Sequence, residues 1–268
     1  MRVIGLCCMA AFPVLAQFRP DEMMKPYAYT NETGEVFMCR LWAPQFPEAG
    51  KVYPLVLFLH GSAECGTDNS KQITQGLPAL LKSLLKHPER VMVLAPQCPP
   101  GMENWWVRRA GMQEDYAAAK DPTPSMEIAL ELCRHLVRDK QADPNRLYIT
   151  GMSLGGFGTW DAIQREPGMF AAAVPICGNG DLRKTQKIKS LPIWVFHAAD
   201  DKNVPVECSR RMVRQLQAIG AKNLIYTEYE KGAHAIWDKA YANPKMIEWL
   251  FKQTREKPAW WQFWRWFD

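Results

Sequence analysis

The sequence predicts an α/β fold with a mostly parallel central sheet, and three observations support that class. The chain has 268 residues, 47% of them hydrophobic, enough for one large domain or two small ones. Several runs carry hydrophobic residues at successive positions, which is typical of strands buried on both faces of a sheet. Helical patterns separate these runs, and such alternation indicates parallel strands with helices on both faces.

The expected elements follow in a regular order. An antiparallel pair of strands comes first, at 27–30 and 36–43, joined by a turn at NETG. Buried strands are expected at 53–61, 90–96, 146–151, 170–178 and 191–198, with a last strand at 223–230. Helices are expected at 77–87, 125–140, 205–220 and 244–253. In such sheets ligands bind where the parallel strands end, so we expect the chemistry at the carboxyl edge.

The N-terminus predicts an export signal. Arg2 precedes an apolar run from Val3 to Ala16, which is short for a bilayer span and typical of the core of a signal peptide. Cleavage is expected before Gln17, giving a signal peptide at 1–16, a catalytic domain at 17–254 and a secreted or periplasmic protein. The alternative is a frayed or buried N-terminal segment.

Charge and cysteine content limit the possible ligands. The net charge is +5, and the densest basic patch, CSRRMVRQ, suits a solvated helix face, so no nucleic-acid partner is expected. Eight cysteines include Cys7 and Cys8 of the predicted signal, and no C-x-x-C pair occurs, so a structural zinc site is not expected. The remaining cysteines leave any disulfide pairing open.

The stretch GMSLGG, residues 151–156, stands between a predicted strand and a predicted helix. Gly151 and Gly155 permit a tight turn that holds Ser153 above the sheet, at the positive end of the helix. Ser153 is therefore the candidate nucleophile, and the alternative is a glycine-rich turn with an idle serine.

A serine nucleophile needs a base and an acid that orients the base. His197 lies inside a strand run, where a packed imidazole is expected. His234 lies in a loop after the last strand and is the candidate base. An acid is expected in FHAADDKNVP, but its adjacent Asp200 and Asp201 cannot both face one partner.

Two backbone N–H groups should stabilise an oxyanion beside the serine. One is expected from Leu154, directly after the nucleophile. The other is expected from Ser62, in the loop that follows LFLHG. His60 is expected to shape that loop.

These motifs resemble those of the α/β-hydrolase superfamily. The resemblance is closest to secreted bacterial esterases related to polyhydroxybutyrate depolymerases and feruloyl esterases, and to predicted peptidases of the prolyl oligopeptidase type. It runs in register from about residue 30 to 254. Its motifs are YPLVLFLHGSAECGTDN (53–69), VLAPQCP (93–99), LYITGMSLGGFGTWD (147–161), AAAVPICGNGD (171–181), WVFHAADDKNVPVECS (194–209) and GAHAIWDKAY (232–241).

The resemblance implies hydrolysis of an ester or amide through an acyl-enzyme, with no metal or organic cofactor. In the family pattern the acid stands four residues after the strand's His and three before the Val of Val–Pro. Counted from His197 and from Val204, this position is Asp201, which leaves Asp200 as a loop or capping residue. The chain departs from the family in having AECG beside the oxyanion loop, where GERG is frequent, and this affects substrate inference.

Substrate contacts are expected near the same edge. Trp105 and Trp106 follow a core strand and are candidates for a pocket wall, and the alternative is that they plug the body of the domain. Glu64, beside the oxyanion loop, is a candidate for recognising a substrate hydroxyl, with a structural hydrogen bond or ion pair as the alternative. Trp237 is expected to pack under the loop of His234.

The tail at 255–268 is rich in tryptophan. On a helix, Trp260, Phe263, Trp264 and Phe267 share one face, which suits a membrane interface or a partner, or packing on the chain's own domain. The sequence thus predicts an exported serine esterase, with feruloyl or acetyl esters of plant polysaccharides as substrates. A serine peptidase of the prolyl oligopeptidase type and a non-catalytic binding module are the rivals.

Overall fold

The structure is a computed structural model that describes residues 18–30, 34, 36–45, 47–108 and 116–255. The predicted signal peptide (1–16) and the tail from residue 256 onward lie outside the described residues. Within them, eight strands form one sheet in the order β1-β2-β4-β3-β5-β6-β7-β8. The strands are β1 Lys25–Thr30, β2 Val36–Trp42, β3 Tyr53–Leu59, β4 Met92–Pro96, β5 Ala142–Met152, β6 Ala172–Ile176, β7 Ile193–Ala198 and β8 Leu224–Tyr229.

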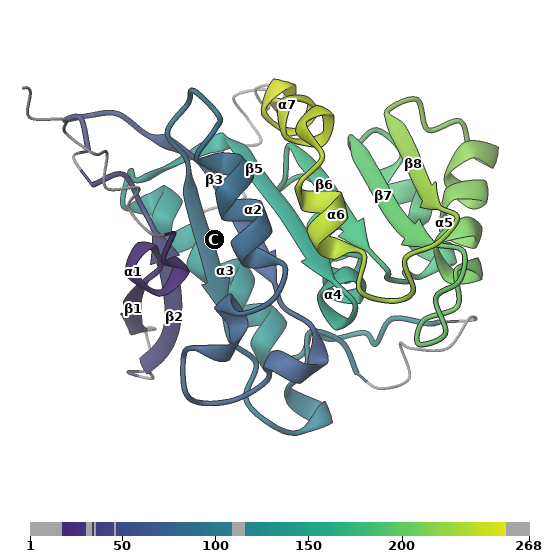
Figure 1. Cartoon of the computed structure of the whole chain (residues 1–268), viewed down its shortest axis with the longest axis horizontal. Coiled ribbons are helices and arrows are strands. Elements are labelled where there is room, and N and C mark those ends of the chain that lie inside the picture. Colours follow the sequence, from purple (N-terminus) through teal and green to yellow (C-terminus); the bar gives the residue numbers. More distant parts are fainter. Residues whose placement is uncertain (1–17, 31–33, 35, 46, 109–115, 256–268) are drawn as a thin grey trace, which may run out of the picture.

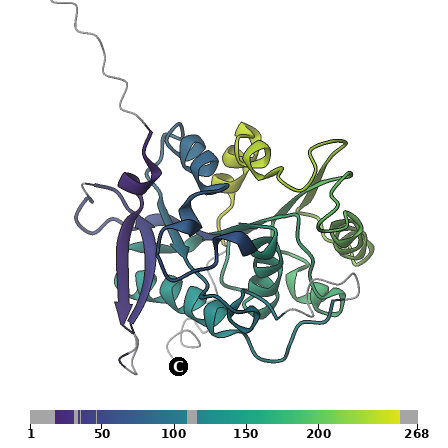
Figure 2. The ribbon, with the colours of Figure 1, turned by 60° about the horizontal axis from the view of Figure 1, so that its bottom comes forward.

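The sheet has the predicted mixture of strand directions. β1 pairs with β2, and β2 with β4, in antiparallel fashion. All later pairings, from β3–β4 to β7–β8, are parallel. Figure 2 shows the β1–β2 pair, in purple, at one end of the molecule and the green α5 at the other. The expected α/β architecture with an antiparallel N-terminal pair is confirmed.

The helices cover both faces of the sheet (Figure 1). They are α1 Pro20–Met23, α2 Leu77–Leu84, α3 Pro124–Arg138, α4 Leu154–Arg165, α5 Glu207–Ala218, α6 Trp237–Tyr241 and α7 Pro244–Lys252. Short 3₁₀ helices are η1 Ser62–Glu64, η2 Lys71–Ile73, η3 Met102–Asn104 and η5 Leu182–Ile188. Among the described residues, none of the helices has the length and hydrophobicity that crossing a membrane requires.

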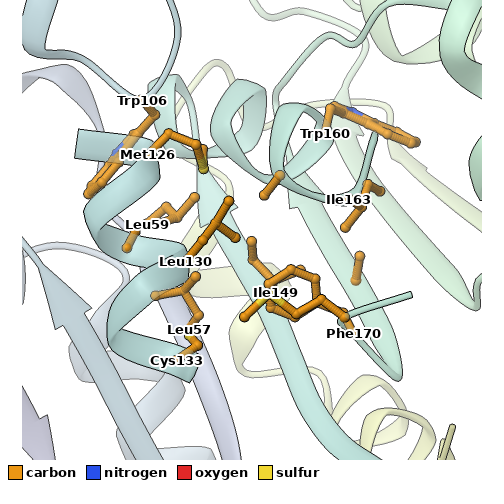
Figure 3. Packing of buried hydrophobic residues seen from close by; sticks show 14 of the residues in the cluster. Leu57, Leu59, Trp106, Met126, Leu130, Cys133, Ile149, Trp160, Ile163 and Phe170 are labelled. Carbon is orange, nitrogen blue, oxygen red and sulfur yellow. The ribbon is translucent and has the colours of Figure 1, made fainter. Parts of the chain in front are cut away.

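The central strands contribute side chains to two hydrophobic clusters, one on each face of the sheet. Leu55, Leu57 and Leu59 of β3 pack with α3, α4 and α5, whereas Val56 and Phe58 pack with α2, α6 and α7. Figure 3 shows part of the first cluster, with the side chains of α3 and α4 packed on β3 and β5. Because successive side chains leave a strand on opposite faces, a strand buried on both sides must be apolar at every position.

The helix starts follow their sequence signals. α3 begins with Pro124, and the side chain of Thr123 accepts a hydrogen bond from the N–H of Met126 at 3.2 Å. This cap satisfies a donor that the first turn leaves free. The parallel strands then end at one edge, where Ser153 follows β5, Asp201 follows β7 and His234 follows β8. This edge positions the candidate site.

Candidate active site

Ser153 stands on a turn that only glycines permit. Its backbone is left-handed (φ 53°, ψ −120°), directly between β5 and α4. A methyl group at Gly151 would lie 2.3 Å from the carbonyl oxygen of Gly155, and one at Gly155 would lie 1.9 Å from that of Leu59. The N–H of Ser153 donates to the carbonyl of Ile176 at 3.0 Å. Direct backbone packing therefore fixes the position of the serine.

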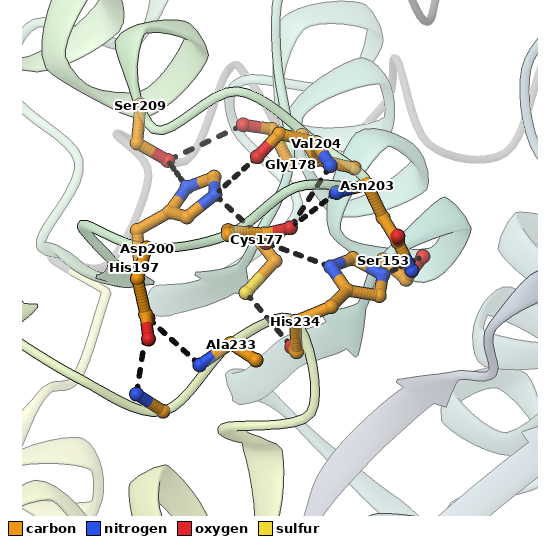
Figure 4. A network of polar contacts seen from close by, with 12 residues as sticks. Ser153, Cys177, Gly178, His197, Asp200, Asn203, Val204, Ser209, Ala233 and His234 are labelled. Atoms are coloured by element: carbon orange, nitrogen blue, oxygen red, sulfur yellow. Dashed lines mark hydrogen bonds and ion pairs between the residues drawn. The ribbon is translucent and has the colours of Figure 1, made fainter.

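The side chains of Ser153, His234 and Asp201 form a continuous chain of hydrogen bonds (Figure 4). Nε2 of His234 lies 2.8 Å from Oγ of Ser153, and Nδ1 lies 2.7 Å from Oδ2 of Asp201. Since an ionised carboxylate can only accept, Nδ1 carries the proton and donates to Asp201. Nε2 is then free to accept the hydroxyl proton of Ser153, which is the tautomer that a general base needs.

Asp201 is buried among hydrogen-bond donors that stabilise its negative charge. Burial opposes its ionisation, but hydrogen bonds from His197, His234 and the N–H groups of Val204 and Asn203 outweigh this and hold the pKa of Asp201 well below its usual range. The two N–H groups donate to Oδ1 at 3.0 and 2.9 Å. The carboxylate is therefore ionised over the whole range in which a histidine titrates.

His197 is packed, as expected, but it also contacts the acid. Its side chain is fully buried, and Nε2 lies 3.0 Å from the carbonyl of Val204 and 3.2 Å from Oδ2 of Asp201. Its Nδ1 lies 2.7 Å from Oγ of Ser209. Both groups near Nε2 are acceptors, so Nε2 must carry a proton. His197 thus contacts the same carboxylate oxygen of Asp201, Oδ2, that the ring of His234 contacts.

The two adjacent aspartates point to different parts of one loop. Asp201 contacts the ring of His234, whereas exposed Asp200 accepts hydrogen bonds from the N–H groups of Gly232 and Ala233 at 3.0 and 2.8 Å. Ala233 has a left-handed backbone with φ 51°. The side chain of Asp200 therefore caps the loop that carries His234, a contact between residues more than thirty positions apart.

The predicted oxyanion loop lies against Ser153, the candidate nucleophile. A methyl group at Gly61 would stand 3.7 Å from Cβ of Ser153. In the described part of the chain, no hydrogen-bond partner is found for the N–H of Ser62 or of Leu154, which begin η1 and α4. These two N–H groups remain the predicted oxyanion donors.

His60 and Trp106 support this loop from below. Nδ1 of His60 donates to the carbonyl of Gly61 at 2.6 Å, and Nε2 accepts from the N–H of Cys98 at 3.0 Å. Burial lowers the pKa of His60 to about 4, so the ring is neutral at pH 7. The indole N–H of Trp106 donates to the carbonyl of His60 at 3.0 Å. This confirms His60 as a loop-shaping residue.

The structure argues against two of the predicted substrate contacts, Trp106 and Glu64. Trp106 is 0% exposed, so the prediction that it lines a pocket is wrong: its ring fills the space under the oxyanion loop. Trp105 is half-buried and remains a candidate. Glu64 is 3% exposed; burial raises its pKa, and it accepts hydrogen bonds from the N–H groups of Gly61 and of its own residue. This contact back to the residue before η1 resembles a capping box and favours a structural role.

Sequence reasoning gave no role to Cys177. Its backbone is left-handed (φ 48°), and its buried thiol donates to the carbonyl of His234 at 3.5 Å. Its sulfur also lies within 4.8 Å of a carboxylate oxygen of Asp201 and a ring nitrogen of His234. These three atoms could bind a metal ion only if the hydrogen bond between Asp201 and His234 were broken. No local pattern could reveal this contact. Trp237 packs edge-on against His234 with ring centroids 5.5 Å apart, as expected.

Comparisons with known proteins agree with this architecture. A model of the prolyl oligopeptidase family matches residues 125–195. A search of curated proteins found no match. Among solved structures, a thermostable esterase is 40% identical with a TM-score of 0.77, and the match covers 87% of this chain and 64% of the esterase.

Two more distant structures share the fold. A ferulic acid esterase is 13% identical with a TM-score of 0.64, over 85% of this chain and 98% of that protein. An acylaminoacyl peptidase of Pyrococcus horikoshii is 14% identical with a TM-score of 0.61, over 89% of this chain and 43% of the peptidase. The chain thus spans less than two thirds of the length of the thermostable esterase and of this peptidase. The sheet, the serine turn and these likenesses together show that the chain has the α/β-hydrolase fold.

Proposed function

We propose that the chain is a serine hydrolase that cleaves carboxylic esters with Ser153, His234 and Asp201. The observation that carries this proposal is the pair of hydrogen bonds, 2.8 and 2.7 Å, that join serine, histidine and aspartate in sequence. Such a constellation converts a weak nucleophile into a strong one, because the base takes the hydroxyl proton as the oxygen attacks.

In the proposed reaction Oγ of Ser153 attacks the ester carbonyl carbon and passes its proton to Nε2 of His234. Asp201 keeps the imidazole in the right tautomer and stabilises its positive charge. The N–H groups of Leu154 and Ser62 hold the oxyanion. The alcohol leaves with the proton from His234, and water then attacks the acyl-enzyme with the same base, which releases the acid and restores Ser153.

The 40% identity to a thermostable esterase supports an ester over an amide as substrate. The match to the prolyl oligopeptidase family supports the rival, a serine peptidase, which would use the same three residues. Feruloyl or acetyl esters of plant polysaccharides are our proposed substrate class, and the fold shared with a ferulic acid esterase is compatible with it. Half-buried Trp105 is the proposed wall for the acyl or sugar group.

Export and tail contacts are proposed on sequence alone. The N-terminal apolar run supports export to the periplasm or the medium. The aromatic residues Trp260, Phe263, Trp264 and Phe267 would share one face of a helix, and this spacing supports contact with a membrane surface or a partner.

Two assays test the proposed function. A fluorophosphonate should label wild-type protein and leave folded Ser153→Ala unlabelled; a folded, unlabelled wild type would instead indicate a non-catalytic module. A nitrophenyl acetate, methyl ferulate and a peptide nitroanilide are then compared by kcat/KM. The esters should be hydrolysed at least about tenfold faster, and a faster peptide amide would establish the peptidase.

A further inference from the structure

The loop that carries His234 is exposed and held at few points. Residues Gly232 and Ala233 are exposed, and Ala233 adopts a left-handed backbone that a residue with a side chain rarely takes. After His234, its carbonyl accepts from the N–H of Ile236 at 3.0 Å and from the thiol of Cys177 at 3.5 Å. Before His234, the two hydrogen bonds to Asp200 hold the backbone (Figure 4).

Asp200 is well placed to act on the base without touching it. Both N–H donors converge on one oxygen, Oδ1, at 3.0 and 2.8 Å, as at an anion-binding turn. Asp200 also directly precedes Asp201, so one short segment after β7 fixes both the ring of His234 and the backbone leading to it. A shift in either would misalign Nε2 with Ser153.

We propose that Asp200 is a positioning residue for the base: its carboxylate holds Gly232 and Ala233 so that His234 meets Ser153 at hydrogen-bond distance. The proposal rests on the proposed function and adds to it a residue that acts through the loop backbone. It explains why both aspartates of the pair serve the same site through different contacts.

The test uses Asp200→Ala and Asp200→Asn in the full chain. Alanine removes the acceptor, and kcat should fall about 10- to 50-fold with KM changed less than about threefold, because positioning affects the reacting atoms more than binding. Asparagine keeps Oδ1 as an acceptor, so it should restore kcat to within about fivefold of wild type. The matched control is Asp238→Ala, which removes an exposed aspartate from α6.

Fluorophosphonate labelling distinguishes this proposal from the proposed function. If wild type labels, Asp200→Ala should label more slowly by the same factor as its loss in kcat. An alanine variant as fast as wild type would overturn the proposal while leaving the hydrolase intact. An asparagine variant as slow as alanine would also overturn it, since charge rather than the two hydrogen bonds would then be responsible. An unlabelled wild type refutes the proposed function itself.

A second feature, independent of the first, is a pair of thiols beside the oxyanion loop. The sulfurs of Cys65 and Cys98 lie within 4.8 Å of each other and of His60, and both are free thiols. The backbone N–H of Gly66 donates to the carbonyl of Cys98 at 2.9 Å, and the side-chain amide Nε2 of Gln97 donates to the carbonyl of Glu64 at 3.0 Å. These bonds keep the two backbones adjacent, which a disulfide requires.

We infer that Cys65 and Cys98 are a disulfide-forming pair that ties the oxyanion loop to the loop after β4. A metal ion is the poorer occupant, because Nε2 of His60 already accepts the N–H of Cys98. Cys65 is half-buried and Cys98 is fully buried, so Cys65 is the thiol that an oxidant reaches. Its thiolate attacks a disulfide such as oxidised glutathione, and the thiolate of Cys98 then displaces reduced glutathione. The pair loses two protons and two electrons, and the oxidant becomes two thiols.

Oxidation of the whole protein with oxidised glutathione, followed by alkylation in denaturant and peptide mapping, tests this pairing. A peptide linking Cys65 to Cys98 is expected, with an increase in Tm of about 5–10 °C and slower hydrogen exchange at residues 61–66 than in the reduced protein. Cys65→Ser should show none of these changes on oxidation. Two fully alkylated thiols after oxidation, a link to another cysteine, or unchanged exchange at the loop would each refute the inference.

Discussion

Ser153 and His234 meet at one hydrogen bond, yet the two regions that hold them differ in every other respect. The turn of Ser153 is buried and is fixed by glycines whose neighbours leave no room for a methyl group. The loop of His234 is exposed at Gly232 and Ala233 and is fixed by hydrogen bonds from side chains and backbone of other segments. The proposed nucleophile is therefore positioned by backbone packing within the fold, whereas the proposed base is positioned by contacts that substitutions can remove one at a time. Substitutions in the two regions should differ accordingly.

Gly155→Ala should have the largest effect, because a methyl group there would lie 1.9 Å from the backbone oxygen of Leu59. Neither side can move without displacing β3 or α4, so we expect a loss of at least about 3 kcal/mol of stability and most of the activity. Gly168→Ala is the matched control, since its methyl group would meet nothing within 4 Å. Urea unfolding of both variants checks this. A Gly155→Ala protein as stable as wild type would show that the serine turn is not fixed by packing.

Asp201→Asn should leave the fold intact and lower kcat by about 10³–10⁴-fold. The amide oxygen can still accept from Asn203 and Val204, but its NH₂ group faces Nδ1 of His234, which then turns to the wrong tautomer. Kinetics on an ester, with circular dichroism as the fold check, would measure it. Asp238→Asn serves as the control for removing one exposed charge. A loss below about tenfold would point to another acid.

The sequence was sufficient to predict the layered fold, and it named the three side chains, Ser153, His234 and Asp201, that the structure joins by hydrogen bonds. Strands β3, β4, β6 and β7 were predictable because burial on both faces makes them continuously apolar. The start of β5 at Ala142 was not, because the residues up to Arg146 are polar and half-buried. The prediction for Trp106 failed because the burial of a loop side chain depends on distant segments. In the same way, Asp200 and Cys177 contact residues that are far away in the sequence, so no local sequence pattern predicts these contacts.

Acid should destabilise the protein through His60, which holds the loop packed against Ser153, because burial lowers the pKa of His60 to about 4 from its ordinary 6.5. The unfolded chain takes up a proton below pH 6.5 that the folded protein refuses until about pH 4, so stability present above pH 6.5 declines as the pH falls. The loss should reach about 3 kcal/mol at pH 4. Urea unfolding at pH 7, 5 and 4 of wild type and His60→Gln isolates this contribution. If the difference in unfolding free energy between wild type and His60→Gln were the same at all three pH values, His60 would not be the source of the acid destabilisation.

The smallest effect is expected where the two regions touch, at Cys177. This residue follows β6, whose Ile176 accepts the N–H of Ser153, and its thiol donates to the carbonyl of His234. A thiol is a weak donor, so Cys177→Ala should lower kcat by only about two- to fivefold, and Cys177→Ser, which keeps a donor, should remain within about twofold. Ester kinetics with a Tm measurement on each variant would check this order. If Cys177→Ala instead lowered kcat about as much as we expect of Asp200→Ala, the thiol of Cys177 would be a principal contact holding His234. The position of the His234 loop would then depend on the buried Cys177 as much as on the exposed Asp200.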